Sequence, residues 1–507
     1  MDSPSQNINP QRFMDSKKVI VIGSGFSGLS AACYLAQQGY SVVVIEKNEQ
    51  IGGRARMFEA EGFKYDMGPS WYWMPDVFER FFQDFGKKVA DYYSLLKLSP
   101  GFQIIFQDQT SFPISNDLEE LELSFENLEK GSGKKLRKFL LNAEYKYNIS
   151  MAELVYKPCH SFTEFIRWDI LKQIFKTQLF SPLSKEVRAA FQNEKLRQIL
   201  EFPVIFLGAM ADKIPALYSI MNYAAMKQGT FYPDGGMVKI VEGMTRLAES
   251  LGVEFITHAT VENIVVEGGK ATGVKMNGNF IGGDIVLSSA DYHHTEMRLL
   301  EETYRNYTEK YWESRIFAPS SILFYLGVNK KIARLMHHNL FFDTDYLAHA
   351  DDIYGNPKWT KEPLFYVCCP SKTDHTVAPE GCENIFILIP HAIQLQDSEA
   401  QLDEYYERIL ARLEKHCGED LHSSVIYKKE FTSKNFIEDY NSYKGNAYGL
   451  ANTVWQTAFL KPKLRNKKVS NLFYTGQLTV PGPGVPPAII SGKIVAKEIH
   501  TYLQSRA

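Results

Sequence analysis

The chain has 507 residues, of which 45% are hydrophobic and 23% charged, and its formal net charge is −3. This length allows two or three domains with a large core, and the near-neutral charge gives no indication of nucleic-acid binding. Aromatic residues reach 13%, enough to line a long apolar cavity, although an aromatic-rich core explains the same figure. Six cysteines without a CxxC pair indicate free thiols in a reducing compartment, and no metal site is predicted.

The N-terminal region carries the pattern of a dinucleotide-binding unit. After a polar segment at 1–16 that we expect to be a disordered tail, a buried strand is predicted at 18–22 and a helix at 29–38. The turn between them is glycine-rich, and bare backbone amides at a helix N-terminus can approach a pyrophosphate closely. A second strand at 41–45 ends at Glu46, whose carboxylate is placed to accept hydrogen bonds from a ribose diol. An ordinary strand-helix-strand unit is the simpler alternative.

A glycine pair, Gly52-Gly53, precedes Arg54 shortly after this unit. Two glycines let the backbone pass close to a phosphate while the guanidinium neutralises its charge. A plain turn followed by a surface arginine is the alternative. From about residue 83 to residue 225 the pattern is mainly helical, and its charge-rich stretches indicate solvated faces.

One predicted helix, within 160–180, is amphipathic. Bulky apolar residues such as Phe165, Ile166 and Phe175 recur every three or four positions, with basic residues among them. Such a helix can lie in a membrane interface, and it can equally pack on a protein core. No segment is long and apolar enough to predict a transmembrane helix. We therefore expect a cytoplasmic protein that associates peripherally with the inner face of the membrane.

The second half of the chain first completes the nucleotide fold and then changes character. A helix at 238–250 is followed by predicted strands at 253–256, 261–266 and 284–288. Further strand-like runs lack the strand-helix-strand rhythm and indicate a mixed or antiparallel substrate sheet; they lie at 322–328, 364–369, 385–390 and 425–427. A final strand at 471–474 leads through a proline-glycine stretch into a terminal helix at 488–502.

These motifs together resemble the carotenoid desaturases related to bacterial phytoene desaturase. The resemblance rests on the glycine turn, Glu46, Gly52-Gly53-Arg54-Ala55, Asp66-Met67-Gly68-Pro69 and the segment from Gly476 to Pro487. Its N-terminal part is shared with FAD amine oxidases and protoporphyrinogen oxidase, whereas the C-terminal segment is narrower. One departure is Gln477, because many relatives carry an acidic residue there.

The resemblance implies an α/β fold with a bound FAD. A Rossmann-like FAD-binding domain would be assembled from the discontinuous segments 17–82, 228–300 and 431–507. A mixed β-sheet substrate-binding domain would comprise 83–110 and 301–430, and the helical region at 111–227 would face the membrane.

The resemblance also assigns residues to the cofactor. It places Gly23, Gly25, Phe26, Ser27 and Gly28 at the pyrophosphate, Glu46 with its neighbour Lys47 at the adenosine ribose, and Gly53 and Arg54 at a phosphate oxygen. Gly68, Pro69 and Ser70 would lie near the flavin ring, with Trp71, Tyr72 and Trp73 the nearest aromatics, and Val261 and Ala290 would flank the adenine. Gly476, Gln477, Val485 and Pro486 would lie beside the ribityl chain and the isoalloxazine, whose negative charge the terminal helix could stabilise.

The activity implied is desaturation of a C40 carotenoid. An allylic C–H is too weak an acid for a side chain to deprotonate, so hydride transfer to the flavin comes first and a weak base or water removes the proton. No catalytic residue is predicted, and the doublets His293-His294 and His337-His338 are expected to be ordinary histidines. We favour 3,4-desaturation of a 1-hydroxycarotenoid over phytoene desaturation, with oxygen or a quinone as electron acceptor. A flavin amine oxidase and a non-enzymatic prenyl or lipid carrier are the alternatives.

Overall fold

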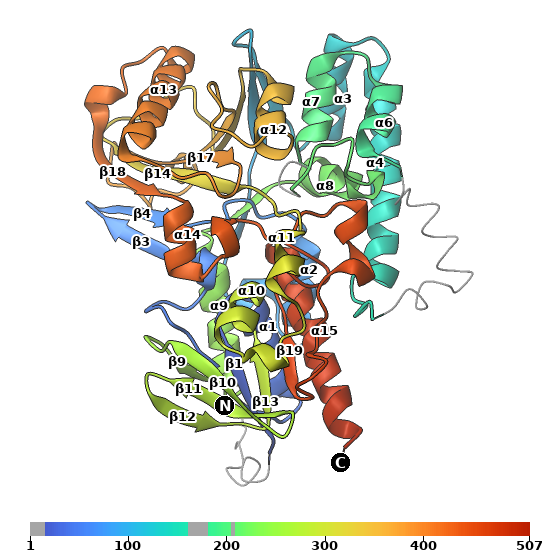
Figure 1. Ribbon diagram of the computed structural model, residues 1–507. Coiled ribbons are helices and arrows are strands. Elements are labelled where there is room, and N and C mark those ends of the chain that lie inside the picture. Colours follow the sequence, from blue (N-terminus) through green and yellow to red (C-terminus); the bar gives the residue numbers. More distant parts are fainter. Residues whose placement is uncertain (1–15, 161–180, 204–207, 507) are drawn as a thin grey trace, which may run out of the picture.

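The computed structural model describes residues 16–160, 181–203 and 208–506. Two of the predictions therefore fall outside the described residues: the tail at 1–16, apart from Ser16, and the amphipathic helix within 160–180, apart from His160. Figure 1 shows two sheets stacked along the molecule, with a bundle of helices beside the upper one. The site lies where these parts meet.

A five-stranded parallel sheet forms the lower part of the molecule (Figure 1). Its order is β19 (Leu472–Tyr474), β13 (Ile285–Ser288), β1 (Lys18–Ile22), β2 (Ser41–Ile45) and β9 (Glu254–Ile256). The apolar runs that predicted these strands are buried on both faces, as is typical of parallel sheets, except in the edge strand β9. The predicted Rossmann-like architecture is confirmed.

The two faces of this sheet are covered differently. Val19, Val21 and Leu287 pack against three helices, α1 (Phe26–Gln37), α9 (Val238–Ser250) and α15 (Val485–Gln504). The opposite face packs against the antiparallel strands β10 (Val261–Glu267), β11 (Lys270–Met276) and β12 (Asn279–Gly282), together with α10 (Tyr292–Arg298).

The first and last long helices approach each other very closely at Gly492. A Cβ atom at this position would lie 2.5 Å from the carbonyl oxygen of Ser27 and 2.6 Å from the Cβ of Ser30. Ser30 also donates a hydrogen bond from its hydroxyl to the Ile489 carbonyl at 2.7 Å. Small residues on both helices therefore bring the C-terminal segment directly against the glycine turn.

A seven-stranded mixed sheet forms the upper part. Its order is β18 (Val425–Phe431), β14 (Ser320–Val328), β17 (Glu383–His391), β16 (Phe365–Cys368), β15 (His338–Phe342), β6 (Phe102–Phe106) and β7 (Ser111–Ile114). All neighbours are antiparallel except β15 and β6. The predicted mixed sheet is confirmed, but it runs through β7, beyond the predicted segment limit at residue 110. One face packs against α13 (Glu399–Cys417).

The other face packs against helices, chiefly α3 (Leu118–Leu128), α4 (Ser132–Ile149), α6 (Leu183–Ala190) and α7 (Glu194–Glu201), beside the short α8 (Ile220–Tyr223). The interval 83–225 is thus less uniformly helical than its pattern predicts, since it also holds β5 (Leu95–Lys97), β6 and β7. The remaining elements are β3 (Met57–Ala60), β4 (Phe63–Asp66), β8 (Phe231–Pro233), α2 (Pro75–Gln83), α11 (Glu309–Glu313), α12 (Tyr346–Tyr354) and α14 (Ser433–Tyr440). Among the described residues, no helix combines the length and apolar character that crossing a bilayer needs.

Candidate functional site

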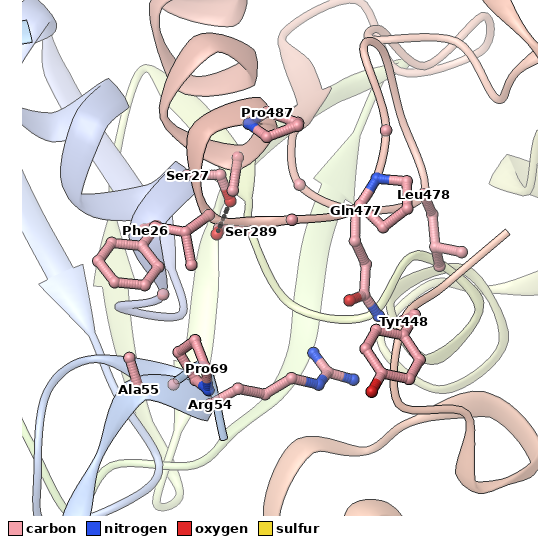
Figure 2. A pocket seen from close by; sticks show the side chains of 18 of the residues that line it. Phe26, Ser27, Arg54, Ala55, Pro69, Ser289, Tyr448, Gln477, Leu478 and Pro487 are labelled. Atoms are coloured by element: carbon pink, nitrogen blue, oxygen red, sulfur yellow. Dashed lines mark hydrogen bonds between the residues drawn. The ribbon is translucent and has the colours of Figure 1, made fainter. Parts of the chain in front are cut away.

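A cavity of about 610 Å³ lies between the two sheets, within the size range of small-molecule sites. It is continuous from the glycine turn to the mixed sheet and holds side chains from the whole length of the chain (Figure 2). Seventeen of the eighteen predicted cofactor residues line it: Gly23, Gly25, Phe26, Ser27, Glu46, Lys47, Gly53, Arg54, Gly68, Pro69, Ser70, Val261, Ala290, Gly476, Gln477, Val485 and Pro486. Gly28 is the exception. The roles of these residues remain predictions.

The three glycines of the turn serve different needs. Gly23 has φ +93°, a conformation that favours glycine, and a Cβ at Gly28 would lie 2.2 Å from the carbonyl oxygen of Gly23. The protein itself therefore requires these two glycines, and Gly28 packs the turn rather than lining the cavity. A Cβ at Gly25, the N-cap of α1, would meet no protein atom within 4 Å. Only the middle glycine leaves room for a ligand at the helix N-terminus.

The carboxylate of Glu46 is buried and firmly held. It accepts hydrogen bonds from the Ser24 amide at 3.0 Å and hydroxyl at 2.7 Å, and from the Asn48 amide at 2.9 Å and side chain at 3.0 Å. A ribose hydroxyl that donates a hydrogen bond to this carboxylate would therefore do so beside the Ser24 and Asn48 donors that already bind it. The ammonium of neighbouring Lys47 donates to the Glu438 carbonyl.

Arg54 reaches across the cavity, and Figure 2 shows its guanidinium directed toward Tyr448. One Nη donates to the Ser442 hydroxyl at 3.0 Å, and the group lies over the Tyr440 ring, 5.0 Å from its centroid. Its Nε is buried and has no hydrogen-bond partner among the described residues. Burial lowers the pKa of Arg54. A buried cationic donor without an acceptor fits a phosphate-bearing cofactor.

The C-terminal segment closes the other side of the cavity. α15 begins after Gly484 with two prolines and no acidic residue in its first turn, so its positive end faces the cavity unneutralised. The Ser27 hydroxyl lies 2.8 Å from that of Ser289, which ties the turn to the end of β13 (Figure 2). The orphaned Arg54 donor, the open space at Gly25 and this helix end together fit FAD.

The wall formed by the mixed sheet is largely apolar. Trp71, Leu323, Phe386 and Leu388 line it. Trp71 stacks on His338 with ring centroids 4.1 Å apart and an interplanar angle of 14°. Tyr72 is predicted to be one of the aromatic residues nearest the flavin, but it does not line the cavity. It is fully buried and stacks on Phe78.

Sequence reasoning missed several cavity residues on this side, among them Tyr366, Phe386, Tyr448 and Asn452. Tyr366 and Phe386 lie on strands, where every second side chain points to the same face of the sheet. Once the face toward the cavity is known, this alternation identifies both residues as candidates. Nothing local distinguishes Asn452, which lies in a loop. His337 and His338 are both buried, and burial lowers the pKa of His337 to about 3 and that of His338 well below its usual value.

A glycine turn with open space at Gly25, joined to a large and mostly apolar cavity, fits a flavin-dependent oxidoreductase. Residues 26–500 match the sequence profile of the flavin containing amine oxidoreductase family. A solved structure of a putrescine oxidase double mutant shares the fold, with a TM-score of 0.62 and 14% identity over 96% of this chain and 99% of that one.

Two relatives narrow the class. The chain is 40% identical to the carotenoid 3,4-desaturase of Haloarcula japonica, over 96% of this chain and 98% of that protein. It is 30% identical to the zeta-carotene-forming phytoene desaturase of Myxococcus xanthus, over 97% and 95%. The chain therefore belongs to the carotenoid desaturase branch of the flavin containing amine oxidoreductase family, as its motifs predicted, and its cofactor is FAD.

Proposed function

We propose that this protein is an FAD-dependent carotenoid desaturase that oxidises the C3–C4 bond of a 1-hydroxycarotenoid. The observation that carries this is the continuity of the main cavity, which joins the nucleotide turn to an apolar, aromatic wall. A polyene held against that wall would lie beside the FAD bound at the glycine turn. The 40% identity to a carotenoid 3,4-desaturase supports the choice of bond.

The residues around the turn would hold the cofactor. The amides at the start of α1 would bind the pyrophosphate, Arg54 would supply its unpaired Nε to a phosphate oxygen, and Glu46 would accept from the ribose. When bound, FAD supplies the two-electron oxidant. The start of α15 would stabilise negative charge at that end of the cavity.

The apolar wall would exclude water and orient the polyene. Oriented binding is a large part of catalysis when the substrate has no charged handle. Trp71 and Trp73 line the cavity, and a ring face turned toward the polyene would stabilise positive charge that develops along it, by about 0.5 to 2 kcal/mol for each ring.

One polar atom of this wall suits a hydroxylated substrate. Asn452 lines the cavity, and its side-chain oxygen is buried and has no hydrogen-bond partner among the described residues. A substrate hydroxyl would satisfy it, whereas a hydrocarbon end would leave it unpaired at a cost of about 1–3 kcal/mol. Asn452 therefore favours a 1-hydroxycarotenoid over phytoene.

We propose that the substrate enters from the inner face of the cytoplasmic membrane. A hollow of about 490 Å³ on the surface is lined by Ile316 and Trp455, which are 55% and 79% exposed, and by the basic residues Lys213 and Arg315. Exposed apolar side chains beside basic ones are suited to an anionic lipid surface. Thr457 and Ala458, which follow Trp455 closely in the chain, line the main cavity, so the surface hollow lies next to a part of the chain that reaches that cavity. Oxygen or a membrane quinone would then accept the electrons.

An anaerobic single-turnover experiment tests the reaction. A 1-hydroxycarotenoid should bleach the flavin absorption and lengthen its own chromophore without any nicotinamide, and phytoene should react more slowly. Asn452→Leu should lower the ratio of the rate with the 1-hydroxycarotenoid to the rate with phytoene by about tenfold, since it removes the unpaired oxygen. Rapid flavin reduction by benzylamine or a polyamine, with no reaction of any carotenoid, would identify an amine oxidase instead. Binding of a carotenoid without flavin reduction would identify a carrier.

A liposome co-sedimentation experiment tests the membrane face. Ile316→Ser with Trp455→Ser should lower binding to anionic vesicles several-fold while the flavin content stays unchanged. Unaltered binding would place the membrane contact elsewhere on the chain.

A further inference from the structure

A second, much smaller cavity lies behind Ser70. Its volume of about 20 Å³ is enough for one water molecule. Most of the residues that line it carry a polar group or a thiol, namely Tyr65, Asp66, Ser70, Tyr232, His337, Cys368 and Asn384, and Met237, Pro370 and Phe386 complete the lining. Two of these groups, the Tyr65 hydroxyl and His337 Nε2, are buried without a hydrogen-bond partner among the described residues. Buried polar atoms are rarely left unpaired, so this cavity is suited to a bound water.

Ser70 connects the two cavities, because it lines both. Tyr366 donates a hydrogen bond from its hydroxyl to the Ser70 hydroxyl at 3.0 Å, and His338 Nδ1 lies 2.6 Å from the same Tyr366 oxygen. His338 is in turn covered by the stacked ring of Trp71. Since Tyr366 fills one acceptor position of Ser70, the serine keeps a proton that it can donate and a lone pair that can accept.

The far side of the small cavity holds the carboxylate of Asp66. Its oxygens accept hydrogen bonds from the Met237 amide at 2.8 Å and the Val238 amide at 3.1 Å, and no ion pair neutralises it among the described residues. The titratable groups around it are Asp374, Tyr232, His337, Cys368, Tyr65 and Tyr325. Enclosure, with a smaller contribution from Asp374, raises the pKa of Asp66 to about 6 despite the two amides.

We propose that the proton released by the substrate leaves through Ser70 and a water in the small cavity to the carboxylate of Asp66. This inference rests on the proposed function. Forming the new double bond breaks two C–H bonds, and one hydrogen departs with both bonding electrons, as the oxidation demands. The other departs as a proton, and its electron pair becomes the new π bond. Ser70 Oγ accepts that proton and passes its own to the water, and the water passes one to Asp66, which becomes a neutral carboxylic acid. Tyr366 and His338 are positioning residues for Ser70.

Three variants of the FAD-loaded protein test the route. Ser70→Ala should lower the rate of desaturation about 100-fold with little change in KM, a typical value for loss of a general base. Ser70→Thr should recover most of that loss because it keeps the hydroxyl. The wild-type rate should rise with pH through about 6 as Asp66 loses its proton, and Asp66→Asn should be slow and lack this rise. Flavin content and melting temperature show whether each variant is folded and loaded.

A crystal structure supplies a readout that does not depend on turnover. It should show a water in the small cavity within hydrogen-bond distance of both the Ser70 hydroxyl and the Asp66 carboxylate. A dry cavity, or a metal ion held by His337, His338 and Cys368, whose ligand atoms lie within 4.8 Å of one another, would overturn the route. So would a Ser70→Ala protein that desaturates at the wild-type rate. If the wild-type protein desaturates no carotenoid, the proposed function itself fails, and these outcomes are thereby distinguishable.

Discussion

The two walls of the main cavity are built in opposite ways. On the nucleotide side backbone meets backbone, and a single added carbon at Gly28 would come within 2.2 Å of a carbonyl oxygen. On the substrate side large side chains such as Trp71, Tyr366 and Phe386 form the surface. The first wall is therefore specified by the absence of side chains and the second by their shape. Substitutions in the nucleotide wall should abolish FAD binding, whereas substitutions in the substrate wall should weaken the use of the carotenoid only in part.

The largest effects should occur in the glycine turn. Gly25→Val places a side chain in open space, so the protein should fold with the melting temperature of the FAD-free wild type but bind no FAD. Gly28→Val should instead destabilise the fold by several kcal/mol, because its Cβ overlaps the Gly23 carbonyl. Flavin absorbance and thermal unfolding separate the two outcomes. A stoichiometric flavin spectrum in folded Gly25→Val protein would show that the cofactor binds elsewhere.

A smaller effect is expected on the substrate wall. Trp71→Ala removes the ring that stacks on His338, and kcat/KM for the carotenoid should fall about tenfold, which corresponds to 1.4 kcal/mol. The flavin content should not change. Tyr72→Phe is the matched control, because this neighbouring side chain lies outside the cavity and only loses a 3.0 Å hydrogen bond to Tyr93. Equal loss of activity in both variants would argue against a distinct substrate wall.

An effect on stability alone is expected at a residue that belongs to neither wall and so serves as a reference for both. Lys461 is 3% exposed, and its ammonium has no hydrogen-bond partner among the described residues. Burial lowers the pKa of Lys461 to about 7. Between pH 7 and about 10 the unfolded chain holds a proton here that the folded chain lacks, so stability should rise with pH.

Lys461→Met should remove that rise and increase the free energy of unfolding at pH 7 by on the order of 1–2 kcal/mol. Urea unfolding at pH 7 and pH 9 measures both effects, with desaturation unchanged. A variant less stable than the wild type at pH 7 would mean that the lysine is favourably solvated or paired.

The nucleotide wall could be predicted from the sequence because its signals are local. The strand at 18–22, the helix at 238–250 and the end of the last strand follow from apolar runs and glycine positions, and the structure places them within a residue or two. The glycine turn, Glu46 and Arg54 were found for the same reason. The strand, the turn and the helix that position the glycine turn follow one another directly along the chain.

The substrate wall could not be predicted to the same depth. β6 is a short buried run that lies between helices and pairs in parallel with β15, more than two hundred residues away in the chain. No local pattern indicates such a partner. The small cavity is harder still, because Ser70, Asp66 and His337 become neighbours only when β4, β15 and the segment after β4 pack together. Hydrogen bonds like that of Tyr366 with Ser70 depend on this packing.

The contact of α1 with α15 at Gly492 has a consequence for synthesis in the cell. The N-terminal glycine turn is completed by a helix that lies more than 450 residues later in the chain, so the nucleotide cavity stays open on one side until the ribosome has made α15. A nascent chain therefore displays the apolar surface of α1 while α15 is still missing. Cofactor capture should therefore follow the synthesis of α15, and a chain truncated before α15 should be degraded or aggregate as a flavin-free protein.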